Sequence, residues 1–406
     1  MRKSIVIITV FLTIVSCSQQ KAMREIEQKM QNIENGLVEF TSPLDVFQAN
    51  SSNRHDTKTL AERMAHYKVP GVSIAVINDY KIEWAKGYGV IEAGTGTAVT
   101  PETFLEAAST TKLLTSAITL YFIEQGRLDL DEDINMYLKS WKIPENEFTR
   151  EQKVTLHLLL THQAGINRPD GGFSCEEGSI PSLVQVLNGE APAQHKPAVV
   201  EYVPGSKWQY SNMGYVVIQM ALEDALGKPF PKIAQETVFR PLKMRSSTLT
   251  YPLRAELKAK EAVPHDAEGI AHEPYMLPTA LAHGGLMTTP SDLARFTVEL
   301  MRAYQGQSDR ILSPEMVRRM FHPELDLDPN ILGVPLSDGL GVFIYGKDQN
   351  FLFLHPGSNF PGATCWLIGS PESGKGAVVM TNGAMGELLS MEIITAIRNE
   401  YSWPGD

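Results

Sequence analysis

Three short motifs contain residue types that can carry out acyl transfer. The first is Ser109-Thr110-Thr111-Lys112, in which the serine and the lysine lie one helical turn apart and therefore on one face of a helix. The amine can accept the serine proton, and unpaired N–H groups at a helix start can hold an oxyanion. The alternative is a serine that only caps a helix, and residues 18–21 show the same spacing. This motif alone indicates a nucleophile without establishing one.

The second motif is Tyr-Ser-Asn at residues 210–212, and the third is His-Pro-Gly at residues 355–357. The phenol of Tyr210 can transfer a proton beside a lysine, and the amide of Asn212 can bind a substrate carbonyl. Gly357 follows an apolar run and allows a strand backbone to approach a ligand closely. The structural alternatives are a loop tyrosine with an Asx-turn and an ordinary Pro-Gly turn.

The elements that must position these motifs come from both ends of the chain. Residues 71–77 and 81–86 have the pattern of a β-hairpin, and residues 109–124 that of a buried helix. Strand-like runs return at 339–345, 351–355, 363–368 and 377–381, before an amphipathic helix at 387–401. The pattern predicts an α+β fold. An antiparallel sheet built from both chain ends is flanked by helices, with an inserted, mainly helical subdomain at about 128–282.

The order S-x-x-K, Y-x-N, H-x-G resembles the serine β-lactamase and penicillin-binding protein superfamily, in its class C β-lactamase-like branch. That branch includes esterases, D-aminopeptidases and DD-peptidases. Supporting phrases are LLLTHQAG at 158–165, GGLMTTPSD at 284–292 and EQG at 124–126. The resemblance covers about residues 56–401 and implies a β-lactamase/transpeptidase-like fold.

The resemblance also implies roles for individual residues. Ser109 would be the nucleophile, Lys112 and Tyr210 the proton-transfer pair, and Asn212 a substrate-orienting amide. The substrate-binding strand would contribute three residues: His355 in place of the family's lysine, Gly357, and Ser358, whose backbone N–H would complete an oxyanion hole with that of Ser109.

The third motif departs from the K-T-G form that holds a substrate carboxylate. A neutral imidazole at His355 binds anions weakly, and Pro356 has neither hydroxyl nor N–H. We therefore expect a serine hydrolase that cleaves ester or amide bonds through a Ser109 acyl-enzyme. Its substrates would be small-molecule esters, peptides or peptidoglycan-like compounds, with esters cleaved faster than cephalosporins. The alternative is a surface-anchored binding protein that keeps the fold without turnover, which would not need a nucleophile beside a base.

Composition argues against several other classes. The 36 basic residues are scattered among 47 acidic ones, giving a net charge of -11, which disfavours nucleic acid. There is no G-x-S-x-G, H-E-x-x-H or C-x-x-C motif, and Gly87-Tyr88-Gly89 lacks the third glycine of a dinucleotide site. The acidic loop at 129–133 is followed by Ile134 where a calcium loop needs glycine. We expect neither a metal nor a cofactor.

The N-terminus has the pattern of an export signal. Arg2 and Lys3 precede an apolar run at 5–15 that is too short to span a bilayer. The run ends at Cys17 in a sequence similar to a bacterial lipobox, which predicts a lipoprotein signal peptide at 1–17 and lipidation of Cys17. The alternative is an ordinary signal peptide that contains a cysteine. We expect a tether at 18–55, a hydrolase domain at 56–402, and export to the bacterial cell envelope with a membrane anchor.

Two further cysteines remain in the predicted mature chain. Exported proteins can form disulfides, so a bond between Cys175 and Cys365 is possible. Cys365 lies in an apolar run, where a buried free thiol is the favoured interpretation.

Overall fold

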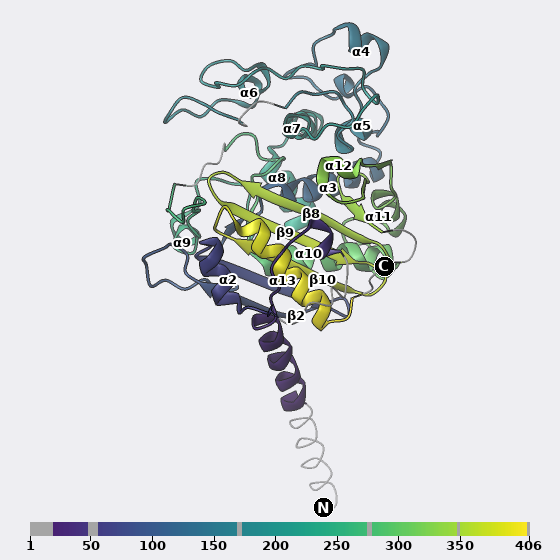
Figure 1. Ribbon diagram of the computed structural model, residues 1–406. Coiled ribbons are helices and arrows are strands. Elements are labelled where there is room, and N and C mark those ends of the chain that lie inside the picture. Colours follow the sequence, from purple (N-terminus) through teal and green to yellow (C-terminus); the bar gives the residue numbers. More distant parts are fainter. Residues whose placement is uncertain (1–18, 48–55, 169–172, 274–277, 347–349, 404–406) are drawn as a thin grey trace, which may run out of the picture.

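The computed structural model describes residues 19–47, 56–168, 173–273, 278–346 and 350–403. Its centre is an eight-stranded antiparallel sheet of order β2-β1-β10-β9-β8-β7-β6-β5 (Figure 1). The strands are β1 (Gly71–Asn78), β2 (Lys81–Gly89), β5 (Leu325–Asp326), β6 (Leu336–Asp338), β7 (Phe343–Tyr345), β8 (Leu352–Asn359), β9 (Ala363–Ser370) and β10 (Lys375–Thr381). The predicted sheet from both chain ends is confirmed, because β1 from the N-terminal part pairs with β10 from the C-terminal part.

Helices cover both faces of this sheet. Helices α2 (Leu60–Tyr67) and α13 (Gly386–Glu400) pack on one face, and α10 (Pro290–Tyr304) packs on the other. The period-two pattern of β1 explains this arrangement. Ile74 and Val76 enter one core, whereas Ala75 and Ile77 enter the other. A strand that is apolar on both faces requires a cover on each side.

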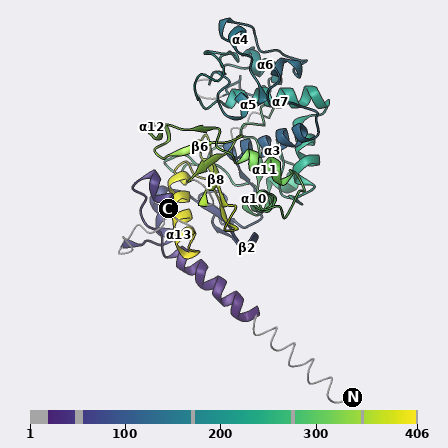
Figure 2. The same cartoon turned by 90° about the vertical axis from the view of Figure 1, so that its right-hand side faces the viewer.

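A mainly helical region follows α3 (Thr111–Glu124), and its helices from α4 (Glu147–Glu151) to α7 (Asn212–Leu226) lie above one end of the sheet (Figures 1 and 2). Its elements are η4 (Ile134–Met136), α4 (Glu147–Glu151), α5 (Leu156–Leu160), α6 (Leu183–Asn188), α7 (Asn212–Leu226), α8 (Phe230–Ala234), the π-helix η5 (Gln235–Phe239) and α9 (Ala255–Lys258). A two-stranded sheet, β3 (Leu105–Glu106) with β4 (Met287–Thr288), connects this region to the main body. The remaining short helices are η1 (Pro43–Val46), α11 (Pro314–Met320) and α12 (Pro329–Leu332).

Within the segment predicted as a tether at 18–55, the described residues 19–47 contain a helix and buried side chains. Residues 19–34 form a helix whose outer end projects from the domain (Figure 1). Beyond it, Leu37, Val46 and Phe47 are buried, and the ring of Phe47 stacks on Tyr345 with centroids 4.2 Å apart. The segment's polar average conceals these few apolar residues, which find a complementary surface beside α13.

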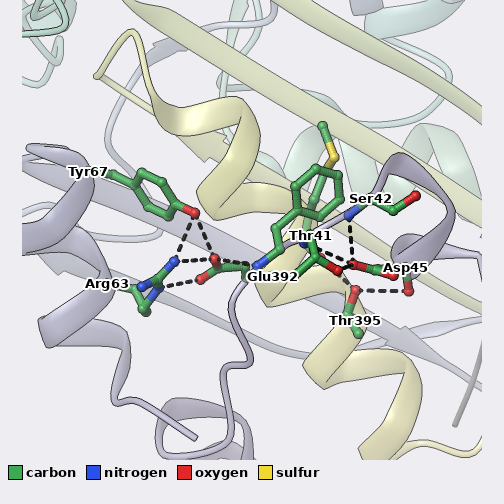
Figure 3. Close-up of polar contacts among 9 residues, drawn as sticks. Thr41, Ser42, Asp45, Arg63, Tyr67, Glu392 and Thr395 are labelled. Atoms are coloured by element: carbon green, nitrogen blue, oxygen red, sulfur yellow. Dashed lines mark hydrogen bonds and ion pairs between the residues drawn. The ribbon is translucent and has the colours of Figure 1, made fainter. Parts of the chain in front are cut away.

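A buried polar cluster fixes this N-terminal segment to the outer helices (Figure 3). Arg63 on α2 donates to both carboxylate oxygens of Glu392 on α13, at 2.8 and 2.6 Å. The hydroxyl of Tyr67 and the backbone N–H of Phe40 also donate to Glu392, at 2.7 and 3.1 Å. Because the carboxylate has four donors, its burial is compensated, and three segments distant in sequence are held together.

The predicted signal peptide and Cys17 lie outside the described residues. Within the described ranges, no helix combines the length and the apolar character required to cross a bilayer. Cys175 and Cys365 are both free thiols.

Candidate active site

Ser109 lies in a tight turn at the start of α3. It is the middle residue of the 3-10 helix η3 (Ala108–Thr110). The helix predicted to start at Ser109 therefore begins two residues later, at Thr111. Ala108, directly before it, has a left-handed backbone with φ +47°. A residue with a Cβ adopts this conformation only when the surroundings enforce it, and such positions concentrate at functional sites.

Lys112 points at the serine hydroxyl from the first turn of α3. Its Nζ lies 3.0 Å from Ser109 Oγ and donates to the carbonyl oxygen of His283 at 2.6 Å. The side chain is fully buried, and burial, followed by the positive charge of Arg168, lowers the pKa of Lys112 well below its usual value. No ion pair with a carboxylate offsets this shift among the described residues. An uncharged amine in this position can accept the serine proton.

Tyr210 lies beside Ser109 and Lys112. Its side chain interacts with that of Ser109, and its ring centroid lies 4.9 Å from Lys112 Nζ. Burial raises the pKa of Tyr210, and the interaction with Ser109 only partly opposes this. The phenol therefore keeps its proton at neutral pH. The three residues chosen from the sequence meet in space, with Lys112 suited to accept a proton and Tyr210 to donate one.

His162 holds the loop that carries Tyr210, a role that the sequence analysis missed. Its imidazole ring lies against the Tyr210 ring, with centroids 4.3 Å apart. Its carbonyl accepts from the Gln209 N–H at 2.8 Å, and its Nδ1 accepts from the Ser211 N–H at 3.1 Å. Burial, with smaller effects of nearby cationic groups, keeps its pKa well below the usual value, so Nδ1 remains an acceptor. His162 belongs to the family phrase at 158–165, but the sequence does not indicate which groups its side chain contacts.

Asn212 is the first residue of α7, two positions after Tyr210. Its Oδ1 is buried and has no hydrogen-bond partner among the described residues. A buried acceptor without a partner costs about 1–3 kcal/mol, which a substrate donor would recover. That Asn212 orients the substrate stays a prediction.

Strand β8 passes directly beside the nucleophile. The carbonyl of His355 accepts from Thr110 Oγ1 at 2.9 Å. A Cβ on Gly357 would lie 2.8 Å from the backbone nitrogen of Ser109, so a side chain at this position would collide with the turn. Ser358 follows on the exposed side of the strand and lines the cleft.

The His355 side chain is placed differently from the expectation. It is 1% exposed, its Nδ1 lies 2.8 Å from the carbonyl oxygen of Pro356, and it does not line the cleft. Burial and the nearby Lys112 lower its pKa to about 3. The ring packs 5.2 Å from Phe343, beneath the cleft floor. A neutral, buried imidazole cannot supply the positive charge of the family's lysine.

A cleft of about 620 Å³ opens over Ser109. Its lining residues are Ser109, Arg168, Trp208, Gln209, Tyr210, Phe343, Pro356, Gly357, Ser358 and Glu387. The guanidinium of Arg168 lies 5.8 Å from the Tyr210 ring and has no ion pair within the described structure. Trp208 Nε1 donates at 2.7 Å to Asp338, whose pKa burial raises to about 8. A slightly larger hollow, about 690 Å³, lies between α2 and β2, but it contains none of these catalytic groups.

The part of the chain that the structure describes contains no group of three or more His, Cys, Asp or Glu side chains arranged to hold a metal ion. The hydroxyl of Ser109, the amine of Lys112 and the phenol of Tyr210 lie together at the cleft.

The family model described as Beta-lactamase matches residues 57–397. The chain belongs to the beta-lactamase family. This confirms the resemblance inferred from the three motifs, and the match spans the complete sheet and the region that carries Tyr210 and Asn212.

Comparison with curated proteins gives distant relatives. The D-alanyl-D-alanine-carboxypeptidase/endopeptidase AmpH of Escherichia coli K12 is 25% identical over 328 residues, 79% of this chain and 82% of AmpH. The unguisins hydrolase ungD' of Aspergillus campestris is 24% identical over 273 residues, 63% of this chain, but the match spans only 48% of that protein's length. The relatives' names support a hydrolase.

The fold is also that of solved structures. An octameric penicillin-binding protein homologue from Pyrococcus abyssi superposes with a TM-score of 0.67 at 26% identity, over 82% of this chain and 74% of that one. The β-lactamase/transpeptidase-like fold is confirmed.

Proposed function

We propose that this chain is a serine hydrolase that cleaves ester or amide bonds through an acyl-enzyme on Ser109. The observation that carries the proposal is the buried Lys112 amine, 3.0 Å from Ser109 Oγ and without a carboxylate partner in the described structure. A lysine kept for stability would be paired or exposed, because burying its charge is costly.

In the first half-reaction, Ser109 Oγ–H gives its proton to Lys112 Nζ and the oxygen attacks the substrate carbonyl carbon. The backbone N–H groups of Ser109 and Ser358 stabilise the oxyanion of the tetrahedral intermediate. As the carbon–leaving-group bond breaks, the phenol of Tyr210 donates a proton to the departing oxygen or nitrogen, and the Lys112 ammonium restores the phenol's proton. The ester on Ser109 remains.

In the second half-reaction, water attacks that ester. The amine of Lys112 takes up the water proton, the phenol of Tyr210 protonates the leaving Ser109 oxygen and recovers a proton from the Lys112 ammonium, and the carboxylic acid product departs. The side-chain amide of Asn212, whose buried Oδ1 lacks a partner within the described structure, is the group that we propose orients the acyl group.

The substrate class that we propose is small esters and peptides, including peptidoglycan-like peptides. The name of AmpH supports peptides. The neutral, buried His355 and the Pro356 beside it supply no fixed cation on β8, which supports faster cleavage of esters than of cephalosporins. Equal or faster cephalosporin cleavage would overturn this ranking.

Labelling with a fluorophosphonate probe tests the proposal. Wild type should form a stable adduct, and Ser109→Ala should not. Ser206→Ala, at an exposed loop serine, is the matched control and should label like wild type. An adduct that persists in Ser109→Ala would refute the assignment of the nucleophile, and absence of any adduct in a folded wild type would favour a binding protein.

A further inference from the structure

A part-buried hydrogen bond connects strand β3, which leads into the turn that carries Ser109, to the end of strand β8. Asn359, the last residue of β8, donates from Nδ2 to Glu106 Oε2 at 2.6 Å. Glu106 is the last residue of β3 and is only 4% exposed. Burial raises the pKa of Glu106 to about 7, and the hydrogen bond from Asn359 opposes this rise. Above that pH the bond joins an amide to a carboxylate and is charge-assisted.

The position of this bond relates it to the chemistry. Glu106 precedes Ser109 by three residues, and Asn359 directly follows Ser358. The bond therefore spans the two chain segments whose N–H groups, those of Ser109 and Ser358, would hold the oxyanion. Between them, Gly357 runs so close to the turn that no side chain fits.

The turn needs an external restraint. Ala108, between Glu106 and Ser109, has the left-handed φ of +47°, which a residue with a Cβ avoids in a free chain. On one side, the backbone fixes the turn, since the Ala107 N–H donates to the Leu286 carbonyl at 2.8 Å. On the β8 side, the side chains of Glu106 and Asn359 provide a second restraint.

The same amide reaches the loop that holds the lysine. Asn359 Nδ2 also donates to the carbonyl of Gly284, at 3.4 Å. The neighbouring carbonyl, that of His283, accepts from Lys112 Nζ at 2.6 Å. The Asn359 side chain thus connects the end of β8 to Glu106, ahead of the Ser109 turn, and to the loop at 283–284, where Lys112 is bound.

We propose that Glu106 and Asn359 are a positioning pair that sets the separation of the Ser109 and Ser358 N–H groups. The inference rests on the proposed function, because it concerns the oxyanion hole of that reaction. Neither side chain touches substrate. The pair acts through backbone geometry, and a displacement of about 1 Å in such a site can lower the rate about 10²-fold. The effect falls on kcat, because the oxyanion forms only in the transition state.

Exchanging the two partners tests this role. In the variant N359D a carboxylate replaces the amide donor that faces Glu106, and assays well above pH 7 prevent the two carboxylates from sharing a proton. Under these conditions kcat for an activated ester should fall about 10²-fold with KM within about threefold of wild type. In E106Q the amide oxygen still accepts from Asn359, and kcat should stay within about fivefold. In the double variant E106Q/N359D the donor and acceptor trade places, and kcat should recover at least tenfold relative to N359D.

The matched control is Ser308→Ala. It removes hydrogen bonds of 2.8 and 2.9 Å to Glu299, a buried carboxylate on α10, and should lower Tm without lowering kcat. The inference is wrong if N359D loses no more kcat than this control, or if the double variant recovers none of it. If N359D does not fold, the kcat of Asn359→Ala, which introduces no second carboxylate, decides.

These outcomes remain separate from a failure of the proposed function. Wild-type activity that persists in Ser109→Ala would overturn the acyl-enzyme itself. Activity that depends on Ser109 but is insensitive to N359D would overturn only the positioning pair.

Discussion

Replacing Lys112 by methionine removes the proton acceptor while keeping an unbranched side chain in the same buried space. General-base catalysis contributes about 10²–10⁴ in rate, so K112M should lose roughly 2.7–5.4 kcal/mol of transition-state stabilisation. The rate of acylation should fall, because Lys112 Nζ, 3.0 Å from Ser109 Oγ, accepts the serine proton in that step.

The same substitution should change how stability depends on pH. In the folded protein the pKa of Lys112 is well below 10.5, so below that pH the unfolded chain binds more protons at this residue. The lysine therefore lowers the free energy of unfolding of wild type at low pH. This penalty disappears as pH rises from the folded pKa towards 10.5. K112M lacks the term, so the stability of wild type relative to K112M should increase with pH.

Two measurements check this prediction. The rate of ester-driven acylation should fall at least about 10²-fold in K112M, while fluorescence or circular dichroism confirms a native fold. Urea unfolding of both proteins at several pH values should give a difference in free energy that favours wild type more at higher pH. A K112M enzyme that acylates at the wild-type rate, or a difference in stability that is constant with pH, would refute the buried, uncharged lysine.

Three further predictions concern the cleft, the outer helices and the N-terminus. Arg168→Gln should raise KM for an ester with an acyl carboxylate, such as a hemisuccinate, but should not raise KM for a neutral ester. The control Lys207→Gln, at a lysine that lies on the Tyr202 ring outside the cleft, should change neither KM. Equal effects of Arg168→Gln on both esters would contradict a role for the charge of Arg168. Arg63→Met leaves buried Glu392 without its cation and should lower the free energy of unfolding by about 3–5 kcal/mol in chemical denaturation. Adding Glu392→Leu in the same chain should restore part of this loss. A loss below about 1 kcal/mol in Arg63→Met would mean that the ion pair is dispensable. If Cys17 is lipidated, Cys17→Ser should move the protein from the membrane to the soluble fraction of cells, and an unchanged distribution would count against the anchor.

The sheet and the catalytic group were predictable because local patterns determine them. The hairpin at 71–86 and the late strands have clear apolar runs, and the antiparallel sheet followed from their order. The serine and lysine of S-x-x-K meet because one helical turn separates them, even though Ser109 lies in a 3-10 turn before α3. Tyr210 could be added only through resemblance, since no local pattern brings it within reach of Ser109.

The remaining features depend on how deeply each side chain is buried and on contacts between residues far apart in the chain, which local sequence patterns do not show. His355 and Gly357 lie on the same side of β8, but only the three-dimensional structure reveals that the histidine is buried and the glycine contacts the turn. The bond between Glu106 and Asn359 joins residues 253 positions apart. Arg168 reaches the cleft from a loop whose course no periodicity predicts.

The packing of the described residues 19–47, before α2, could not be predicted for a related reason. Its few apolar side chains, Leu37, Val46 and Phe47, are too sparse to form a periodic pattern, and a polar average favoured a tether. They are buried because the outer face of the sheet and α13 present an apolar surface to them. The burial of such sparse apolar residues can be recognised only when the surface that they pack against is known.

The most direct test of the account is mass spectrometry of the enzyme stopped by acid during turnover of an activated ester. The account predicts that the acyl group is attached to the peptide that contains Ser109, and that K112M accumulates it far more slowly. Turnover with no acylated peptide, or with the acyl group on a different residue, would contradict the acyl-enzyme on Ser109.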